Sequence, residues 1–301
     1  MAADIEASIQ GLLAAHSAEG VIIGLSGGID SAVLTALAVC ALGSGRVYAY
    51  HLHDRHSEEE SRYRAQLLAD WLGIGLSLHS IDRAMRKKRV YRPVIMRIMA
   101  LSGFMNRYLN GRLHRMLYGE SPFISTLRKG RFDGSKLKKL LYDRTVGYVE
   151  ESFNARHKYR RHFLERRGEE QNCLVLGAAN RSECMVGWFV KDGIDDMPFS
   201  PLNGLYKTQV RQLARHLNLP AKIQKQAASP DMAKGITDEH AMGISYAELD
   251  IILHGLDNSF SDEQIIEAGV TEEQIAHVRM MNMLSAWKRT DEPEPEVHKA
   301  G

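Results

Sequence analysis

The stretch VIIGLSGGIDSAVLTALAVCAL, residues 21–42, carries the clearest structural pattern in the chain. Its apolar start, Val21 to Ile23, is typical of a short buried strand. A turn rich in glycine and serine follows, and apolar residues then recur at helical spacing from Leu34 to Ala41. The pattern therefore predicts a strand, a tight loop and a helix in immediate succession.

A loop of this kind is suited to binding phosphate. Its three glycines can adopt positive φ and leave the backbone open to an anion, and its two serines add hydroxyl donors. The helix that follows directs its unpaired N–H groups and the positive end of its dipole toward the same space. The expected phosphate contacts are Gly24, Ser26, Gly27, Gly28 and Ser31.

The loop lacks two common nucleotide-binding signatures. A Walker loop needs a lysine after its last glycine, whereas Ile29 and Asp30 follow here, and the GxGxxG spacing is absent. The segment SGGIDS instead resembles the PP-loop of the ATP pyrophosphatases, which split ATP into AMP and pyrophosphate. The resemblance implies that the loop grips the pyrophosphate end of ATP and that Asp30 holds Mg²⁺.

Alternating strand and helix patterns continue on both sides of this loop, as in an α/β fold with a parallel sheet. The expected strands are residues 20–24, 46–51, 75–81 and 172–177, and the expected helices are 3–16, 30–42, 58–72 and 207–217. Ligands of such sheets bind beyond the carboxyl ends of the strands. One crevice should therefore be lined by Ser26, Asp30, His51, His53, Asp54 and Asn180.

Composition narrows the class of protein further. The 301 residues are 44% hydrophobic and 25% charged, which is ordinary for a globular protein, and no apolar run is long enough to span a membrane. The N-terminal segment mixes acids into an amphipathic pattern, unlike a signal or transit peptide. Three cysteines without CxxC spacing argue against a zinc site and favour a reducing compartment, so we expect a cytoplasmic protein.

A strongly basic segment interrupts the alternation. Residues 83–148 contain seventeen Lys or Arg and three acids, and apolar residues recur at helical spacing between Val94 and Leu117. One interpretation is an amphipathic helix that packs on the core or on a second subunit. The others are a basic arm that binds a polyanion, such as a dinucleotide or RNA, and a helix on a membrane surface.

A second series of motifs extends the resemblance to one family. In order, the motifs are GAANRSE (177–183), GWFVKDG (187–193), GLYKTQVRQLARHLNLP (204–220), SPDM (229–232), GITDEHAMGISYAELDIIL (235–253) and WKR (287–289). Together with the PP-loop, they resemble NAD synthetases over most of the chain outside residues 83–148. Each motif alone could be structural, but their order along the chain is far more specific.

The resemblance implies an α/β fold of the PP-loop, Rossmann-like type, with a parallel sheet, a basic and mainly helical insert and a helical C-terminus. A single domain would span residues 1–289, with the insert at about 83–148 and a disordered tail at 290–301. The implied activity is an ATP-dependent amide ligase that adenylates nicotinic acid adenine dinucleotide, after which ammonia displaces AMP to give NAD. The implied assembly is a homodimer.

The resemblance also assigns roles to individual residues. The implied catalytic residues are Asp30, Glu183 and Lys191, of which Asp30 and Glu183 would hold Mg²⁺. The implied ATP-binding residues are Gly24, Leu25, Ser26, Gly27, Gly28, Asp30 and Ser31 of the loop, together with Arg156 and Asn180. The implied substrate-binding residues are Lys207, Ser229, Asp238 and Glu239.

The chain departs from the family pattern at three places. Ala178 replaces a threonine after the fourth expected strand, Pro198 stands where the family has the last aspartate of a GDGGxD loop, and Gln226 stands at a lysine position. These changes lie mainly on the side of the carboxylate substrate. Two alternatives therefore stay open: a ligase for another carboxylate, and an RNA-modifying PP-loop enzyme that uses the basic insert. Whether a separate glutaminase subunit supplies the ammonia is open as well.

Overall fold

A computed structural model describes residues 1–91, 111–130, 136–229 and 236–290 of the chain. Most of the helix predicted between residues 93 and 117 lies outside these ranges, and so does the predicted tail after residue 290. Of the basic segment, the structure describes α4 (Asp82–Lys87), α6 (Gly111–Tyr118), α7 (Pro122–Leu127), α8 (Lys136–Tyr142) and the π-helical turn η3 (Asp143–Gly147). The described part of the segment is thus mainly helical, as the sequence predicts.

The core of the fold is a parallel sheet of four strands in the order β3-β2-β1-β4. The strands are β1 (Gly20–Gly24), β2 (Val47–His53), β3 (Leu76–Ser80) and β4 (Cys173–Leu176). Each begins and ends within two residues of its predicted bounds. Val21 pairs with Val47 on one side and with Leu174 on the other, so β1 lies at the centre of the sheet.

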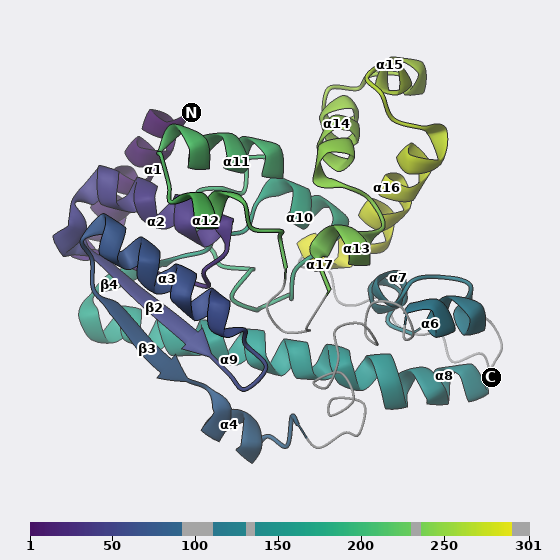
Figure 1. Ribbon diagram of the computed structural model, residues 1–301, viewed down its shortest axis with the longest axis horizontal. Coiled ribbons are helices and arrows are strands. Elements are labelled where there is room, and N and C mark those ends of the chain that lie inside the picture. The colour runs from purple at the N-terminus through teal and green to yellow at the C-terminus, as the bar shows by residue number, and fades with distance from the viewer. Residues whose placement is uncertain (92–110, 131–135, 230–235, 291–301) are drawn as a thin grey trace.

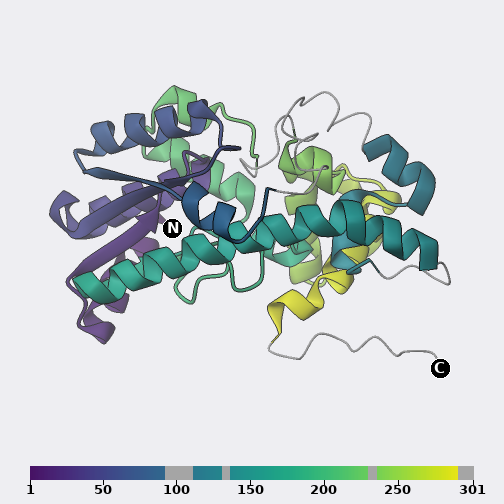
Figure 2. The same cartoon turned by 90° about the horizontal axis from the view of Figure 1, so that it is seen from below.

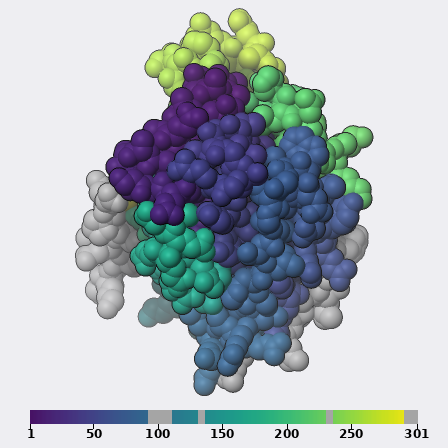
Figure 3. Space-filling view, turned by 90° about the vertical axis from the view of Figure 1, so that its left-hand side faces the viewer, coloured from purple at the N-terminus to yellow at the C-terminus, as the bar shows by residue number. Residues whose placement is uncertain are grey.

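Helices cover both faces of the sheet (Figures 1 and 2). Alternate residues of β1 point to opposite faces, which explains why Val21 and Ile23 belong to one apolar core and Ile22 to another. The first face is covered by α1 (Ala2–His16), α2 (Ile29–Leu42), α3 (Glu59–Leu72), α11 (Lys207–His216) and α12 (Ala221–Gln224). The second face is covered by α9 (Tyr148–Gln171) and α4. Figure 3 shows the end of the molecule that the N-terminal elements form.

A second group of helices packs around a separate apolar core. It comprises α10 (Arg181–Val186), α13 (Asp238–Met242), α14 (Tyr246–Asp257), α15 (Asp262–Glu267) and α16 (Glu272–Leu284), with α7 packed against it. The short η1 (Ser44–Arg46) and α17 (Ala286–Arg289) complete the described elements. The long helix α9 runs from the sheet to the helices of the basic segment (Figure 2). The expected helical C-terminus is therefore confirmed.

All four strands are parallel, but the side of the sheet to which the chain adds strands changes at β1. The chain passes from β1 to β2 and β3 on one side, whereas β4 lies on the other side of β1. In open parallel sheets, ligands bind at such a reversal point, beyond the carboxyl ends of the strands. The described helices include none that could cross a membrane. Cys40, Cys173 and Cys184 are all free thiols, and Cys173 is buried in the core.

Candidate functional site

The loop between β1 and α2 is held by hydrogen bonds within itself. Ser31 Oγ donates to the carbonyl of Gly28 at 3.0 Å and lies 3.0 Å from Ser26 Oγ, and the Gly28 N–H donates to Ser26 Oγ at 3.1 Å. Gly28 caps α2 without a side-chain partner, so the first N–H groups of the helix stay open to a ligand. This geometry matches the phosphate-binding loop that the sequence predicts.

Helix α3 packs closely against the same loop. Gly27 has a φ of +84°, and a Cβ atom there would lie 2.1 Å from the carbonyl oxygen of Ser61. Arg64 donates through Nε to the carbonyl of Gly27 at 3.0 Å. Only glycine can occupy this position without displacing α3, because both the backbone angle and the space exclude a side chain.

Four predicted site residues meet beside the loop. The ammonium group of Lys207 lies 2.6 Å from Asp30 Oδ2 and 2.7 Å from Glu183 Oε1. Asn180 caps α10 by accepting the Glu183 N–H at 3.0 Å, and its amide donates to Asp30 Oδ1 at 3.0 Å. Both carboxylates can therefore reach one cation at the mouth of the loop.

Burial determines the electrostatics of this cluster. Burial raises the pKa of Glu183, and the charge of Lys207 opposes that effect only in part. Burial would lower the pKa of Lys207, but the carboxylates of Asp30 and Glu183 outweigh it and raise the pKa above the ordinary value for lysine. Lys207 consequently keeps its charge at neutral pH.

A further layer of polar contacts holds the cluster in place. The Tyr246 hydroxyl lies 3.1 Å from Glu183 Oε1 and 2.9 Å from Asp238 Oδ2. The N–H of Lys207 donates to Ser182 Oγ at 2.8 Å, and Ser182 in turn donates to the buried carboxylate of Asp250. The starts of α10, α11 and α14 are thus tied together around Lys207.

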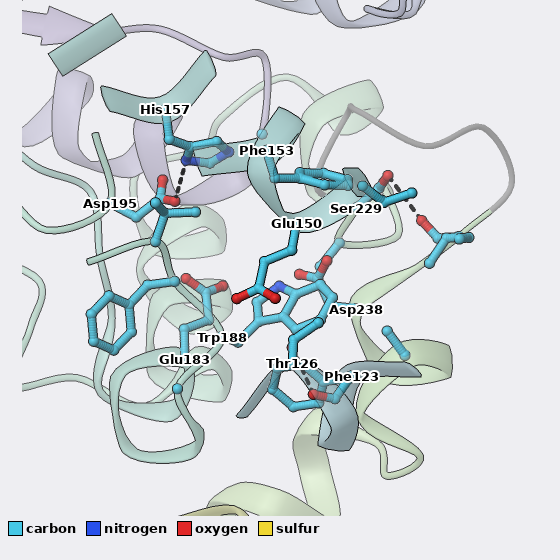
Figure 4. A pocket seen from close by; sticks show the side chains of 18 of the residues that line it. Phe123, Thr126, Glu150, Phe153, His157, Glu183, Trp188, Asp195, Ser229 and Asp238 are labelled. Carbon is cyan, nitrogen blue, oxygen red and sulfur yellow. Dashed lines mark hydrogen bonds and ion pairs between the residues drawn. The ribbon is translucent and has the colours of Figure 1, made fainter. Parts of the chain in front are cut away.

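The cluster opens into a cavity of about 910 Å³ between the sheet and the helices of the second core (Figure 4). The predicted residues that line it are Gly24, Leu25, Ser26, Gly28, Asp30, Ser31, Glu183, Lys207, Ser229 and Asp238, together with His51 from the end of β2. Nδ1 of His51 lies 2.8 Å from the carbonyl of Leu25. A single cavity therefore collects most of the site that the sequence predicts.

Other predicted residues lie outside the lining of this cavity. Arg156 is fully buried and pairs with Asp54 at 3.3 Å. Lys191 donates to the carbonyls of Trp287 and Thr290 at 3.2 and 2.7 Å, and Glu239 accepts the N–H of Tyr246 at 3.0 Å. Gly27, Asn180, His53 and Asp54 also contribute no lining surface. The roles in ATP and substrate binding that the resemblance implies for these residues stay predictions.

The cavity also has a wall that sequence reasoning did not identify. Phe123, Glu150, Phe153, His157, Trp188 and Asp195 line it (Figure 4). Most of them come from α9 and from residues 187–198, a segment whose second half departs from the family pattern. Asp195 and Asp196 stand where the family pattern has glycines, and this difference is the feature of the sequence that could have pointed to the wall. Only the fold shows that Asp195 faces α9.

That divergent segment has a structural role of its own. The N–H of Gly177 donates to the carbonyl of Phe199 at 2.8 Å, and Leu176 and Phe199 form a parallel bridge beside β4. Met197 is buried against Gly177. A Cβ atom added at Gly177 would lie 2.7 Å from the Cβ atom of Met197. The segment that contains Pro198 is thus followed at once by a residue that extends the edge of the sheet beside β4.

Comparison with known proteins points to one family. The sequence model of the family described as NAD synthase matches residues 1–97 and 135–292. The chain is 36% identical over 250 residues to the NH(3)-dependent NAD(+) synthetase of Thermotoga maritima, covering 82% of this chain and 84% of that protein. It is 30% identical over 287 residues to the NH(3)-dependent NAD(+) synthetase of Coprothermobacter proteolyticus, with 93% of each chain covered.

Solved structures share the fold. The NMN synthetase of Francisella tularensis superposes with a TM-score of 0.68 and 22% identity, covering 99% of both chains. The NH3-dependent NAD synthetase of Campylobacter jejuni superposes with a TM-score of 0.63 and 21% identity, covering 98% of this chain and 96% of that one. The predicted PP-loop, Rossmann-like fold is therefore confirmed.

Proposed function

The chain belongs to the NAD synthase family, and we propose that it is an ammonia-dependent NAD synthetase. The enzyme uses ATP to adenylate the carboxylate of nicotinic acid adenine dinucleotide, and ammonia then displaces AMP to form the amide. The observation that carries this proposal is the convergence of Asp30, Glu183 and Lys207 beside an open phosphate loop.

Asp30 and Glu183 are the residues that would hold Mg²⁺. Both carboxylates approach the Lys207 ammonium within 2.7 Å, so both can reach one cation at that point. No group of three or more His, Cys, Asp or Glu suited to a metal occurs among the residues that the structure describes. Two carboxylates nevertheless suit Mg²⁺, because this ion completes its shell with water and phosphate oxygens. When bound, Mg²⁺ neutralises charge on the pyrophosphate leaving group.

The protein's own groups account for the first step. The open N–H groups of α2 and the hydroxyls of Ser26 and Ser31 bind phosphate oxygens, and Lys207 supplies a fixed positive charge beside them. A carboxylate oxygen of the acceptor attacks the α-phosphorus of ATP, a new O–P bond forms, and the bond to pyrophosphate breaks. The task of the site is to position these atoms and stabilise the departing charge.

The apolar part of the cavity suits the acceptor. Phe123, Phe153 and Trp188 offer aromatic faces on the wall opposite the loop, where a flat heteroaromatic ring can stack. Arg160, which also lines the cavity, donates through Nε to the carbonyl of Leu52 at 3.0 Å. A dinucleotide with one aromatic carboxylate fits this combination of apolar surface and scattered charge.

The proposal also covers the domain organisation of the chain, its assembly and its location in the cell. Residues 1–289 form one synthetase domain with its basic insert at about 83–148, which includes the stretch 98–134 that the family model leaves unmatched. The enzyme is a cytoplasmic homodimer. Leu137, Leu140 and Leu141 of α8 are exposed, and this apolar surface supports a second subunit as their cover.

One assay tests the activity directly. The protein is incubated with Mg-ATP, ammonium and nicotinic acid adenine dinucleotide, and equal amounts of AMP, pyrophosphate and NAD are expected. A parallel reaction with nicotinic acid mononucleotide tests the acceptor, and one with glutamine as the sole nitrogen source should give no amide. Formation of ADP and phosphate, or AMP release that depends on neither acceptor, would contradict the proposal.

A further inference from the structure

A histidine and an aspartate form a pair on the cavity wall. Nδ1 of His157, on α9, lies 2.6 Å from Oδ2 of Asp195 (Figure 4). Both side chains line the cavity. Burial opposes ionisation of Asp195, but the adjacent His157 and Arg160 outweigh it and lower the pKa of this carboxyl. Asp195 therefore places a negative charge directly beside Nδ1 of His157.

The divergent loop that carries Asp195 is docked rigidly on α9. Lys158 Nζ reaches Asp192 at 3.2 Å, and Arg161 Nη1 donates to the carbonyl of Asp196 at 2.7 Å. A Cβ atom at Gly193 would lie 2.9 Å from Cβ of His157, so the backbone approaches the helix closely there. These contacts fix the imidazole and the carboxylate relative to each other.

The same loop reaches the phosphate site. A Cβ atom at Gly24, where the phosphate loop begins, would lie 2.8 Å from Cδ1 of Ile194. Ile194 directly precedes Asp195, so the pair stands one residue away from a contact with the end of β1. The pair therefore lies close to the end of β1, beyond which the adenylated carboxylate of the proposed reaction would be held.

The amide-forming step needs a base, because ammonium has no free electron pair with which to attack carbon. Other ionisable groups on the wall are engaged: Glu183 with Lys207, Glu150 with the Tyr142 hydroxyl at 3.0 Å, and Lys288 with the carbonyls of Gly187 and Phe189. Nε2 of His157, by contrast, has no hydrogen-bond partner among the residues described. The negative charge of Asp195, 2.6 Å from Nδ1, favours the tautomer that carries its proton on Nδ1 and leaves Nε2 able to accept one.

We propose that His157, oriented by Asp195, is the base that converts ammonium into ammonia in the cavity. Nε2 takes one proton from ammonium, and the nitrogen lone pair attacks the carbonyl carbon of the acyl-adenylate. The C–N bond forms, the C–O bond to AMP breaks, and AMP leaves with that electron pair. The second nitrogen proton departs as the adduct collapses, so the acyl-adenylate and ammonium give the amide, AMP and two protons. This inference rests on the proposed function.

The test measures adenylation and amide formation separately in the variant His157→Gln. Exchange of labelled pyrophosphate into ATP, dependent on nicotinic acid adenine dinucleotide, reports adenylation and should stay close to wild type. Amide formation from ammonium should fall roughly 100-fold, the usual contribution of a general base. Hydroxylamine is a weaker base than ammonia and is mostly uncharged at mildly alkaline pH, so it should restore rapid turnover of the adenylate.

A second variant and a control complete the experiment. Asp195→Asn places an amide donor against Nδ1 and favours the wrong tautomer, so it should show the same split between exchange and amidation. His162→Gln changes an imidazole on the same helix that is 75% exposed and should leave both rates unchanged. Equal losses of exchange and amidation, or wild-type amidation in His157→Gln, would overturn the inference. Absence of exchange in the wild-type enzyme would instead refute the proposed function itself.

Discussion

The two walls of the cavity are built in different ways. The phosphate wall, which comprises residues 24–31 with Asn180, Glu183 and Lys207, is a network of short hydrogen bonds between polar groups. The acceptor wall comprises α6, α7, the first turns of α9 and residues 187–198, and it is mainly apolar surface with scattered charges. Under the proposed function, the phosphate wall holds charged groups in one geometry, and the acceptor wall offers apolar surface with few polar groups, as small-molecule sites commonly do. Of the three departures from the family pattern, the one at Pro198 lies in a segment that forms the acceptor wall.

The largest effect should come from the centre of the phosphate wall. In Asp30→Asn the side chain keeps its shape but loses the charge that faces Lys207 at 2.6 Å. We expect pyrophosphate release to fall by at least about 1000-fold, since a carboxylate and its metal account for several kcal/mol of transition-state stabilisation. The melting temperature should change little. Asp70→Asn on the exposed side of α3 is the matched control, and near-normal turnover in Asp30→Asn would exclude Asp30 from catalysis.

The second effect concerns the stability of the same wall. Gly27→Ala combines a φ of +84° with a Cβ atom 2.1 Å from the carbonyl oxygen of Ser61, a backbone atom that cannot rotate away. We expect a loss of about 3 kcal/mol in the free energy of unfolding, measured in urea, with a weaker stabilisation by ATP. Gly45→Ala has open space and should be nearly neutral. Equal stability of the two variants would show that α3 does not brace the loop.

The sequence predicts the phosphate wall far better than the acceptor wall. Strands, helices and the phosphate loop follow from local patterns: a run of apolar residues, a glycine turn and helical periodicity. Even here the sequence shows which residues matter but not how they meet. Asp30 and Lys207 are 177 positions apart, and only the packing of α11 against α2 brings the ammonium between the two carboxylates.

The acceptor wall depends on contacts that no local pattern encodes. Arg156 matches a family position near ATP, but in the fold its guanidinium pairs with Asp54, 102 residues earlier. Lys191 lies in a recognisable motif and yet bonds to backbone carbonyls after α16. His157 and Asp195 have no shared motif at all. Their pairing follows from the way residues 187–198 dock on α9, which is a property of tertiary packing.

The third effect tests whether the acceptor wall is the more acid-sensitive one. His114 of α6 is buried, and burial lowers its pKa to about 4. The unfolded chain binds a proton near pH 6.5, so stability from this group is present above that pH and is lost as the pH falls toward 4. The full loss is roughly 3 kcal/mol.

Melting temperatures measured between pH 7 and pH 4.5 check this expectation. His114→Gln can keep the contact with Ser125 Oγ, which lies 2.8 Å from Nε2, but it has no proton to gain. The variant should therefore lose less stability than wild type as the pH falls. His216→Gln, at an exposed position of α11, should follow wild type throughout. Parallel pH curves for wild type and His114→Gln would contradict the prediction.

The smallest effect should lie where the two walls touch. Gly24 and Gly27 belong to the same loop, but a Cβ atom at Gly24 would meet only the side-chain ends of Ile194 and Leu164, at 2.8 and 3.2 Å. Because these ends can shift, Gly24→Ala should cost only about 1 kcal/mol of stability. The strain falls on the loop that carries Asp195, so the KM of the acceptor should rise more than that of ATP. Ile194→Val removes the very methyl group in conflict, and the double variant should recover most of the loss, with a coupling of about 0.5–1 kcal/mol. Strictly additive losses in the double variant would show that the phosphate wall and the acceptor wall are energetically independent at this contact.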